Sequence, residues 1–195
     1  GIEIEQEAVD TLNQHFKADN LTVVKGDIFD MPFDDGTFDH VISLGVLEHF
    51  EDKAVQRKAI QEHIRVMKDD GRFLITVPYL SFVRLMVHVP FLQLVKLVRA
   101  IKGTKSFFTE YRYGKGEFER VIRDNGLVVE EIVWDDMTEP YNFGLTVDYP
   151  INRFMKDGRV QYKGNALGNS LFRTLWKINP ALVSGGIGFV CKKAG

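Results

Sequence analysis

Residues 21–50, LTVVKGDIFDMPFDDGTFDHVISLGVLEHF, contain two short apolar runs that are rich in β-forming residues. The runs are Leu21–Val24 and His40–Leu44, and each leads into small or acidic residues, Gly26-Asp27 after the first and Gly45 after the second. Short buried strands that end in polar, flexible residues are typical of an open parallel α/β sheet, which binds its ligand beyond the strand ends. We therefore expect two strands with their binding loops in this segment.

Helical and strand patterns alternate on both sides of that segment. We expect strands at residues 1–4, 21–24, 40–44, 72–77, 127–134 and 186–193, and helices at 5–18, 53–67, 116–125 and 166–178. This alternation predicts an α/β fold with a mostly parallel sheet and helices on both faces. No strong crossover helix separates the last two strands, so we expect the last strand to be antiparallel.

Composition narrows the class of protein. The 195 residues are 45% hydrophobic and 27% charged, which is ordinary for a soluble globular protein, and we expect one domain over residues 1–195. The net charge of −2 gives no general reason to expect a nucleic-acid partner. The single cysteine, Cys191, rules out an internal disulfide and fits a reducing compartment, so we expect a cytoplasmic protein.

Two segments interrupt the alternation, a lid insertion at residues 79–109 and a second insertion at 137–184. The first contains an amphipathic helix pattern at Pro90–Lys102, and no acidic residue occurs between Gly71 and Thr109. This helix is too short and too charged to span a bilayer. Two readings stay open: a lid helix packed on the domain, which we favour, and a helix in peripheral contact with an anionic membrane.

Four segments carry a resemblance to a known family. They are Gly1–Glu5 (GIEIE), Gly26–Phe33 (GDIFDMPF), Thr37–His49 (TFDHVISLGVLEH) and Met67–Pro78 (MKDDGRFLITVP). Their order and spacing resemble those of class I S-adenosylmethionine-dependent methyltransferases, and most of all the small-molecule branch that includes quinone-ring methyltransferases. The resemblance implies a Rossmann-like fold, S-adenosylmethionine as cofactor, S-adenosylhomocysteine as product and a small, hydrophobic acceptor.

The same resemblance implies residues that bind the nucleoside. Glu3, with Ile4 beside it, is placed to accept hydrogen bonds from the ribose hydroxyls. Asp27 and the amide of Ile28 are placed to contact the adenine edge, while Ile28 and Phe29 could enclose the ring. The alternative is that Asp27 only caps a turn.

The end of the second apolar run supplies the remaining site residues. In the family, the positions of Ser43, Leu44 and Gly45 line the methionine part of the cofactor. His49 follows, and histidine is the side chain best suited to accept a proton near neutral pH. We hold a catalytic base and a helix-capping histidine as equal alternatives. The five histidines show no metal-ligand spacing, so we expect no metal site.

One departure from the family matters. The Gly-rich loop and the strand that precede Glu3 in the family are absent from this sequence, so we expect that upstream sequence is missing. This departure motivates a second hypothesis, a non-catalytic binding or regulatory domain with the methyltransferase fold. A third hypothesis, a nucleic-acid methyltransferase, would use the basic residues Arg72, Arg84, Lys96, Arg99, Lys102 and Lys105. At a net charge of −2 it is the least supported of the three.

Overall fold

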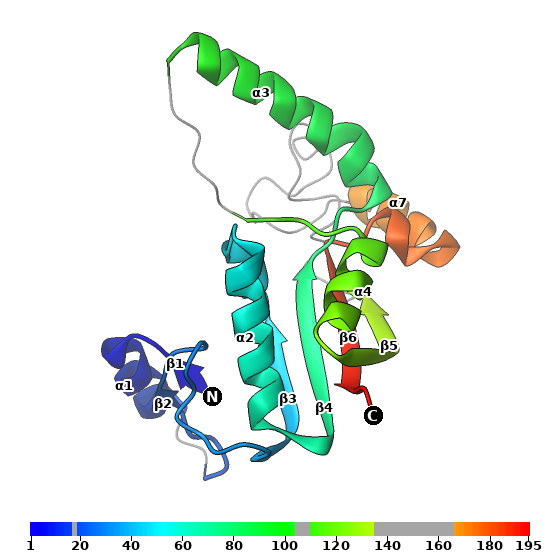
Figure 1. Ribbon diagram of the computed structural model, residues 1–195. Helices are drawn as coiled ribbons and strands as arrows, with labels where there is room; N and C mark the ends of the chain where they lie inside the picture. The colour runs from blue at the N-terminus through cyan, green and yellow to red at the C-terminus, as the bar shows by residue number, and fades with distance from the viewer. Residues whose placement is uncertain (17–18, 104–109, 135–165) are drawn as a thin grey trace.

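The computed structural model describes residues 1–16, 19–103, 110–134 and 166–195, and these form two sheets (Figure 1). A parallel two-stranded sheet pairs β1 (Ile2–Glu3) with β2 (Val24–Lys25). The larger sheet has the strand order β3-β4-β6-β5, with bounds Phe38–Leu44, Met67–Pro78, Gly186–Lys193 and Leu127–Trp134. Within the described residues, no strand pairing joins the two sheets.

The larger sheet is mixed, because one strand, β6, runs against the other three. β3 and β4 are parallel, whereas β6 runs antiparallel to both β4 and β5. The antiparallel direction of the last strand is thus confirmed. β6 lies between β4 and β5 because of how the chain enters it. The Tyr79 amide donates to the Gly185 carbonyl over 2.8 Å, so β6 starts beside the end of β4 and runs back along it.

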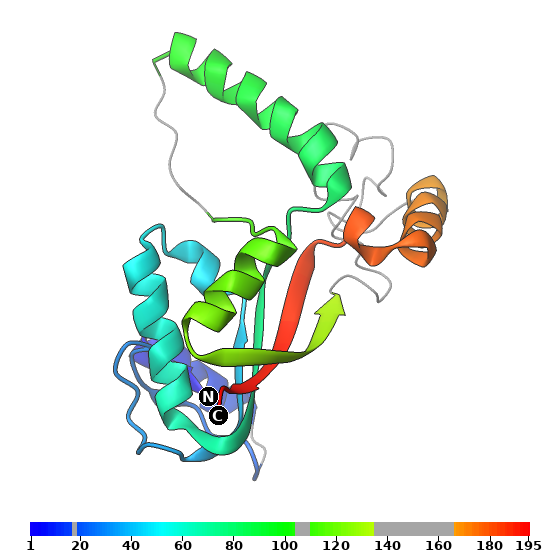
Figure 2. The same ribbon diagram turned by 45° about the vertical axis from the view of Figure 1, so that its right-hand side comes forward.

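Two helices cover one face of the larger sheet, α2 (Lys53–Val66) and α4 (Lys115–Asp124) (Figure 2). The side chain of Asp52 caps α2 by accepting from the Ala54 amide over 2.8 Å. Alternate residues of β4 face these helices and are buried; they are Phe73, Ile75 and Val77. Burial of one residue in two is what the two-residue period of a strand produces when one face packs against helices.

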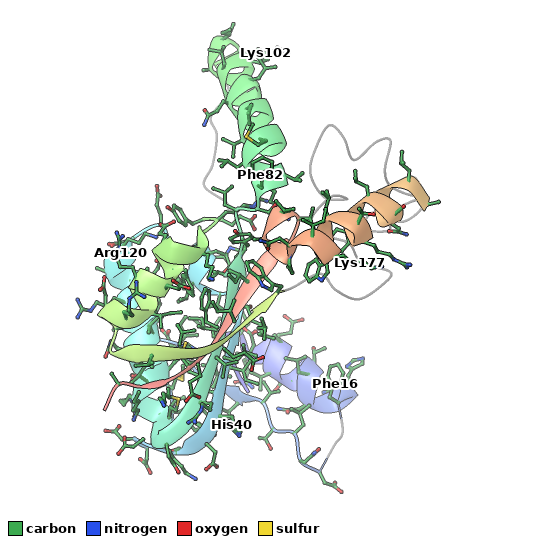
Figure 3. The ribbon with its side chains drawn as sticks, turned by 90° about the vertical axis from the view of Figure 1, so that its right-hand side faces the viewer. Phe16, His40, Phe82, Lys102, Arg120 and Lys177 are labelled. Carbon is green, nitrogen blue, oxygen red and sulfur yellow. The ribbon has the colours of Figure 1, made fainter. Side chains whose placement is uncertain are left out.

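The opposite face of the sheet is less covered than we expected. Ile42 and Leu44 of β3 are each 61% exposed. Helix α1 (Gln6–His15) lies on that side, away from α2 and α4, as Figure 3 shows. Helices therefore occupy both sides, but among the described residues the apolar edge of β3 stays open on one of them.

A long helical arm leaves the end of β4. One π-helical turn, η2 (Arg84–His88), continues into α3 (Val89–Ile101), and the arm runs from Phe82 at its base to Lys102 at its tip, away from the sheet (Figure 3). The described apolar side chains of α3 include Leu94, Leu97 and Ile101, which are 57%, 59% and 78% exposed. The expectation of a lid helix packed on the domain is therefore not what the structure shows. No helix in the described ranges is long and apolar enough to cross a bilayer.

The described part of the second insertion contains α7 (Ala166–Ile178), with the bounds that the sequence predicts. The short helix η3 (Pro180–Leu182) follows it. Phe172 of α7 and Val183 are buried together in a small cluster separate from the main core. Residues 137–165 of this insertion lie outside the described residues.

Candidate functional site

The ends of β1 and β2 bring two predicted site residues together. Glu3 is in register with Lys25, and the Gly26 amide donates to the Glu3 carbonyl over 3.0 Å. Asp27 follows directly in the turn after β2. A side chain at Gly26 is excluded because its Cβ would lie 2.8 Å from Cδ of Pro32. Glu3 and Asp27 thus occupy the same end of two adjacent parallel strands.

The carboxylate of Glu3 is held by its own chain. Its Oε1 atom accepts from the amides of Ile4 at 2.8 Å and Glu5 at 3.1 Å. A carboxylate has about four acceptor positions, so two amides leave capacity for hydroxyl donors. Ile4 is 57% exposed beside it. Glu3 can therefore bind a pair of hydroxyls without giving up its backbone contacts.

Asp27 stabilises the turn that it starts. Its Oδ1 atom accepts from the Phe29 amide over 2.9 Å, so the turn-capping alternative is realised. The Asp27 side chain is exposed. Ile28 and Phe29 pack against the core, and the Phe29 ring meets Phe50 edge-on at 5.2 Å between centroids. The packing holds the Phe29 ring in place before any adenine binds beside it.

An arginine that the sequence analysis did not single out anchors the following loop. Arg65 of α2 donates to the carbonyls of Phe33 at 2.8 Å and Met31 at 3.1 Å, and pairs with Asp35 at 2.7 Å. The hydrogen bonds that Arg65 donates to the carboxylates of Glu62 and then Asp35 raise the pKa of Arg65 above its ordinary value. An arginine on an amphipathic helix is usually a solvated charge, so no local sequence pattern distinguishes Arg65 from the other charged residues of α2.

The three predicted residues at the end of β3 point in different directions. Ser43 is buried on the side of α2, whereas Leu44 is exposed on the other face. Gly45 has a φ of +64°, a conformation that side chains rarely adopt. Its amide donates to the Thr76 carbonyl over 3.3 Å. The structure therefore places these residues on the larger sheet, and no ladder links them to Glu3 and Asp27 among the described residues.

The short helix η1 (Leu47–His49) follows β3 and contains two adjacent titratable residues that differ in exposure. His49 is exposed, whereas Glu48 is only 4% exposed. Burial raises the pKa of the Glu48 carboxyl above its ordinary value. Its Oε2 atom has no hydrogen-bond partner among the described residues. A buried acid without a partner is a stronger sign of a ligand site than an exposed histidine.

The chain returns to Glu48 after the arm. The Tyr111 amide donates to the Glu48 carbonyl over 2.9 Å, and Tyr113 is fully buried with its hydroxyl donating to Oε1 of Gln56 over 2.7 Å. Lys53 lies 4.0 Å from the centre of the Tyr111 ring and donates to the Tyr113 hydroxyl over 3.3 Å. Burial lowers the pKa of Lys53. Two distant parts of the sequence, residues 48–56 and 111–113, are thus packed together next to η1.

Residues 1–75 match the family described as a methyltransferase domain. The match covers less than half of the 195 residues. A protein of Encephalitozoon cuniculi that is named as a methyltransferase is 36% identical over 66 residues, which cover 34% of this chain and 31% of that protein. The chain thus spans about a third of the curated relative that it matches.

Solved structures of methyltransferases share the fold of the chain. A complex of the Haloferax volcanii Trm112 methyltransferase activator with a methyltransferase matches with a TM-score of 0.58 and 19% identity, covering 100% of this chain and 71% of that one. An S-adenosylmethionine-dependent methyltransferase of Methanosarcina mazei matches with a TM-score of 0.57 and 12% identity, covering 100% and 81%. At these identities the likeness concerns the fold alone. The resemblance to methyltransferases that the sequence predicts is confirmed by the family match over residues 1–75.

Proposed function

We propose that the protein transfers a methyl group from S-adenosylmethionine to a small, hydrophobic acceptor. The observation that carries this proposal is the placement of Glu3 and Asp27 at one end of adjacent strands, inside the segment that matches the methyltransferase family. The cofactor supplies an activated methyl group on a sulfonium ion. The protein then has to bind both molecules, align them and exclude water.

Each candidate residue receives a role in this proposal. Glu3 binds the ribose hydroxyls beside Ile4, and Asp27 binds the adenine edge next to Ile28 and Phe29. At the end of β3, Ser43, Leu44 and Gly45 line the methionine part. The exposed His49 returns the acceptor's proton to water.

Calorimetry with S-adenosylhomocysteine tests the binding half of the proposal. We expect Asp27→Ala and Glu3→Ala to weaken binding by about tenfold or more, because each removes a charged hydrogen-bond acceptor. Glu7→Ala, an exposed acid on α1, is the matched control and should bind like wild type. The absence of heat and of any thermal shift at millimolar ligand with the wild-type protein would remove the proposal.

We also propose that the arm at residues 90–102 makes peripheral contact with a membrane. The exposed apolar residues Pro90, Leu94, Leu97 and Ile101 recur at spacings of four, three and four residues, which aligns them along one side of α3. No acid occurs between residues 71 and 109, so the arm suits an anionic lipid surface. β4 leads directly into the base of the arm, so a lipid-soluble acceptor would arrive near the strand ends (Figure 1).

Sedimentation with phosphatidylserine-containing vesicles tests this contact against phosphatidylcholine vesicles. Leu97→Asn should reduce pelleting with both lipids, and Lys96→Glu/Arg99→Glu should reduce it mainly with the anionic one. Equal pelleting of the charge-reversed variant and the wild type would refute the electrostatic part.

A non-catalytic domain with this fold is the second candidate. Among the described residues no strand pairing joins the β1–β2 sheet to the larger sheet, which favours this candidate because cofactor-binding groups on both sheets must be held together. Cofactor binding without turnover of any small-molecule acceptor would support it.

The structure weakens the nucleic-acid alternative. Arg84 is buried and donates to the Tyr79 and Gly185 carbonyls, and Arg72 pairs with Glu130. Neither guanidinium is therefore free for phosphates.

A further inference from the structure

The carboxyl of Glu48 is a buried acid whose second oxygen is unpaired. The residue is 4% exposed, and Oε2 has no hydrogen-bond partner in the described part of the chain. The Tyr113 hydroxyl bonds Gln56, and the Lys53 ammonium lies over the Tyr111 ring. Glu110 adds repulsion, which disfavours the carboxylate further. A buried polar atom left without a partner calls for an explanation, and a ligand that fills the site would supply the missing partner.

The position of Glu48 indicates which molecule would supply the missing partner. On one side, its Oε1 atom lies 3.2 Å from where a Cβ of Gly45 would be, so the carboxyl touches the turn at the end of β3. On the other side its backbone is bonded to Tyr111, in the segment that follows the arm. Glu3 and Asp27 belong to the other sheet. Glu48 therefore lies between the proposed methionine site at the end of β3 and the segment that follows the arm.

We propose that Glu48 contacts a hydroxyl group of the acceptor and receives its proton during methyl transfer. This inference rests on the proposed function and assigns the acceptor to the class of phenols and other apolar molecules with a reactive hydroxyl. The acceptor oxygen forms a bond to the methyl carbon, the carbon–sulfur bond breaks, and its electron pair stays on the sulfur, which becomes a neutral thioether. The hydroxyl proton goes to Oε2 of Glu48. His49, on the same helical turn, then exchanges it with water.

Binding of two probes of similar shape tests this assignment. We would measure 4-methylphenol and 1,4-dimethylbenzene by calorimetry in the presence of saturating S-adenosylhomocysteine. The wild type should bind the phenol at least about tenfold more tightly, because a site built to bond a hydroxyl discriminates against an analogue that lacks it. Glu48→Leu should abolish this preference. Glu51→Leu changes an exposed neighbouring acid in the same way and should retain it.

The outcomes separate this inference from the proposed function. If the wild type binds S-adenosylhomocysteine but shows no preference for the phenol, the role of Glu48 is overturned while the proposed function stands. A tenfold loss of S-adenosylhomocysteine affinity in Glu48→Leu also overturns it, because the carboxyl would then pair with the cofactor's ammonium group. Failure of the wild type to bind S-adenosylhomocysteine refutes the proposed function itself.

Discussion

Replacing Glu48 by leucine should stabilise the folded protein at pH 8. The wild-type carboxyl is 4% exposed and its Oε2 atom is unpaired, so folding removes it from water without full compensation. An unsatisfied buried polar group costs about 1–3 kcal/mol, and more when it is charged. Leucine is similar in size and keeps most of the packing contacts. We therefore expect the free energy of unfolding to rise by about 1–3 kcal/mol, or about 2–4 °C in Tm for each kcal/mol.

The size of this gain should depend on pH in a known direction. Burial raises the pKa of Glu48 in the folded protein above its unfolded value of about 4.3. A raised pKa means that the folded state holds the proton more tightly. The stability from this group is therefore fully present below the unfolded pKa and is lost as the pH rises through the folded pKa. The advantage of the leucine variant should be small near pH 4 and greatest at pH 8.

Urea unfolding at 25 °C between pH 4 and pH 8 measures the difference directly. Groups distant from residue 48 titrate alike in the two proteins, so the difference between them reports Glu48 and the charges coupled to it. The Glu51→Leu variant, which changes an exposed acid, should show no such pH-dependent gap. A gap that is constant with pH, or a wild type that is the more stable protein at pH 8, would refute the argument. A gain in stability together with a loss of phenol binding is the trade-off expected when a strained group serves function.

Three further substitutions test the packing around the site. Tyr113→Phe removes the hydroxyl that donates to the buried Gln56, so we expect a loss of about 1–3 kcal/mol in urea unfolding; an unchanged midpoint would contradict this bond. Arg84→Met removes the side-chain donor of the Tyr79 carbonyl and one of the two donors of the Gly185 carbonyl at the base of the arm, and should cost at least about 1 kcal/mol. We expect the Arg84→Met variant to show faster amide hydrogen exchange in that turn, and an exchange rate equal to that of the wild type would argue against a stabilising role for Arg84. Gly188→Ala places a Cβ 2.6 Å from Cγ2 of Val133 inside the sheet, and overpacking of this kind costs about 1–3 kcal/mol. A variant with wild-type Tm would show that β5 moves aside at no cost.

Elements with a strong local pattern were predicted well. β5, β6 and α7 have the expected bounds, and α2 differs from its predicted range by one residue at its end. Hydrophobic periodicity and end signals such as the Asp52 cap depend on neighbouring residues alone, so they can be read directly. The adjacency of Glu3 and Asp27 was also expected, because each follows an apolar run.

The pairing of strands and the surroundings of the site were less predictable. The sequence around Glu48 and His49 drew attention to the histidine, yet the acid is the buried one. Its backbone carbonyl accepts from the amide of Tyr111, which lies more than sixty residues away in the chain. Arg65 likewise gains its role only when the loop at Met31 and Phe33 packs against α2.

The order of elements and the polar ends of the first strands are properties of the chain itself, since they arise from local propensity and from the two- and 3.6-residue periods of apolar side chains. The inner place of β6, the open face of β3, the projecting arm and the unpaired oxygen of Glu48 depend on tertiary structure. Each of these features results from contacts between segments that are distant in the sequence. The residues that pack around a charge decide how far it is desolvated, and those that pack around a strand decide which strand becomes its neighbour.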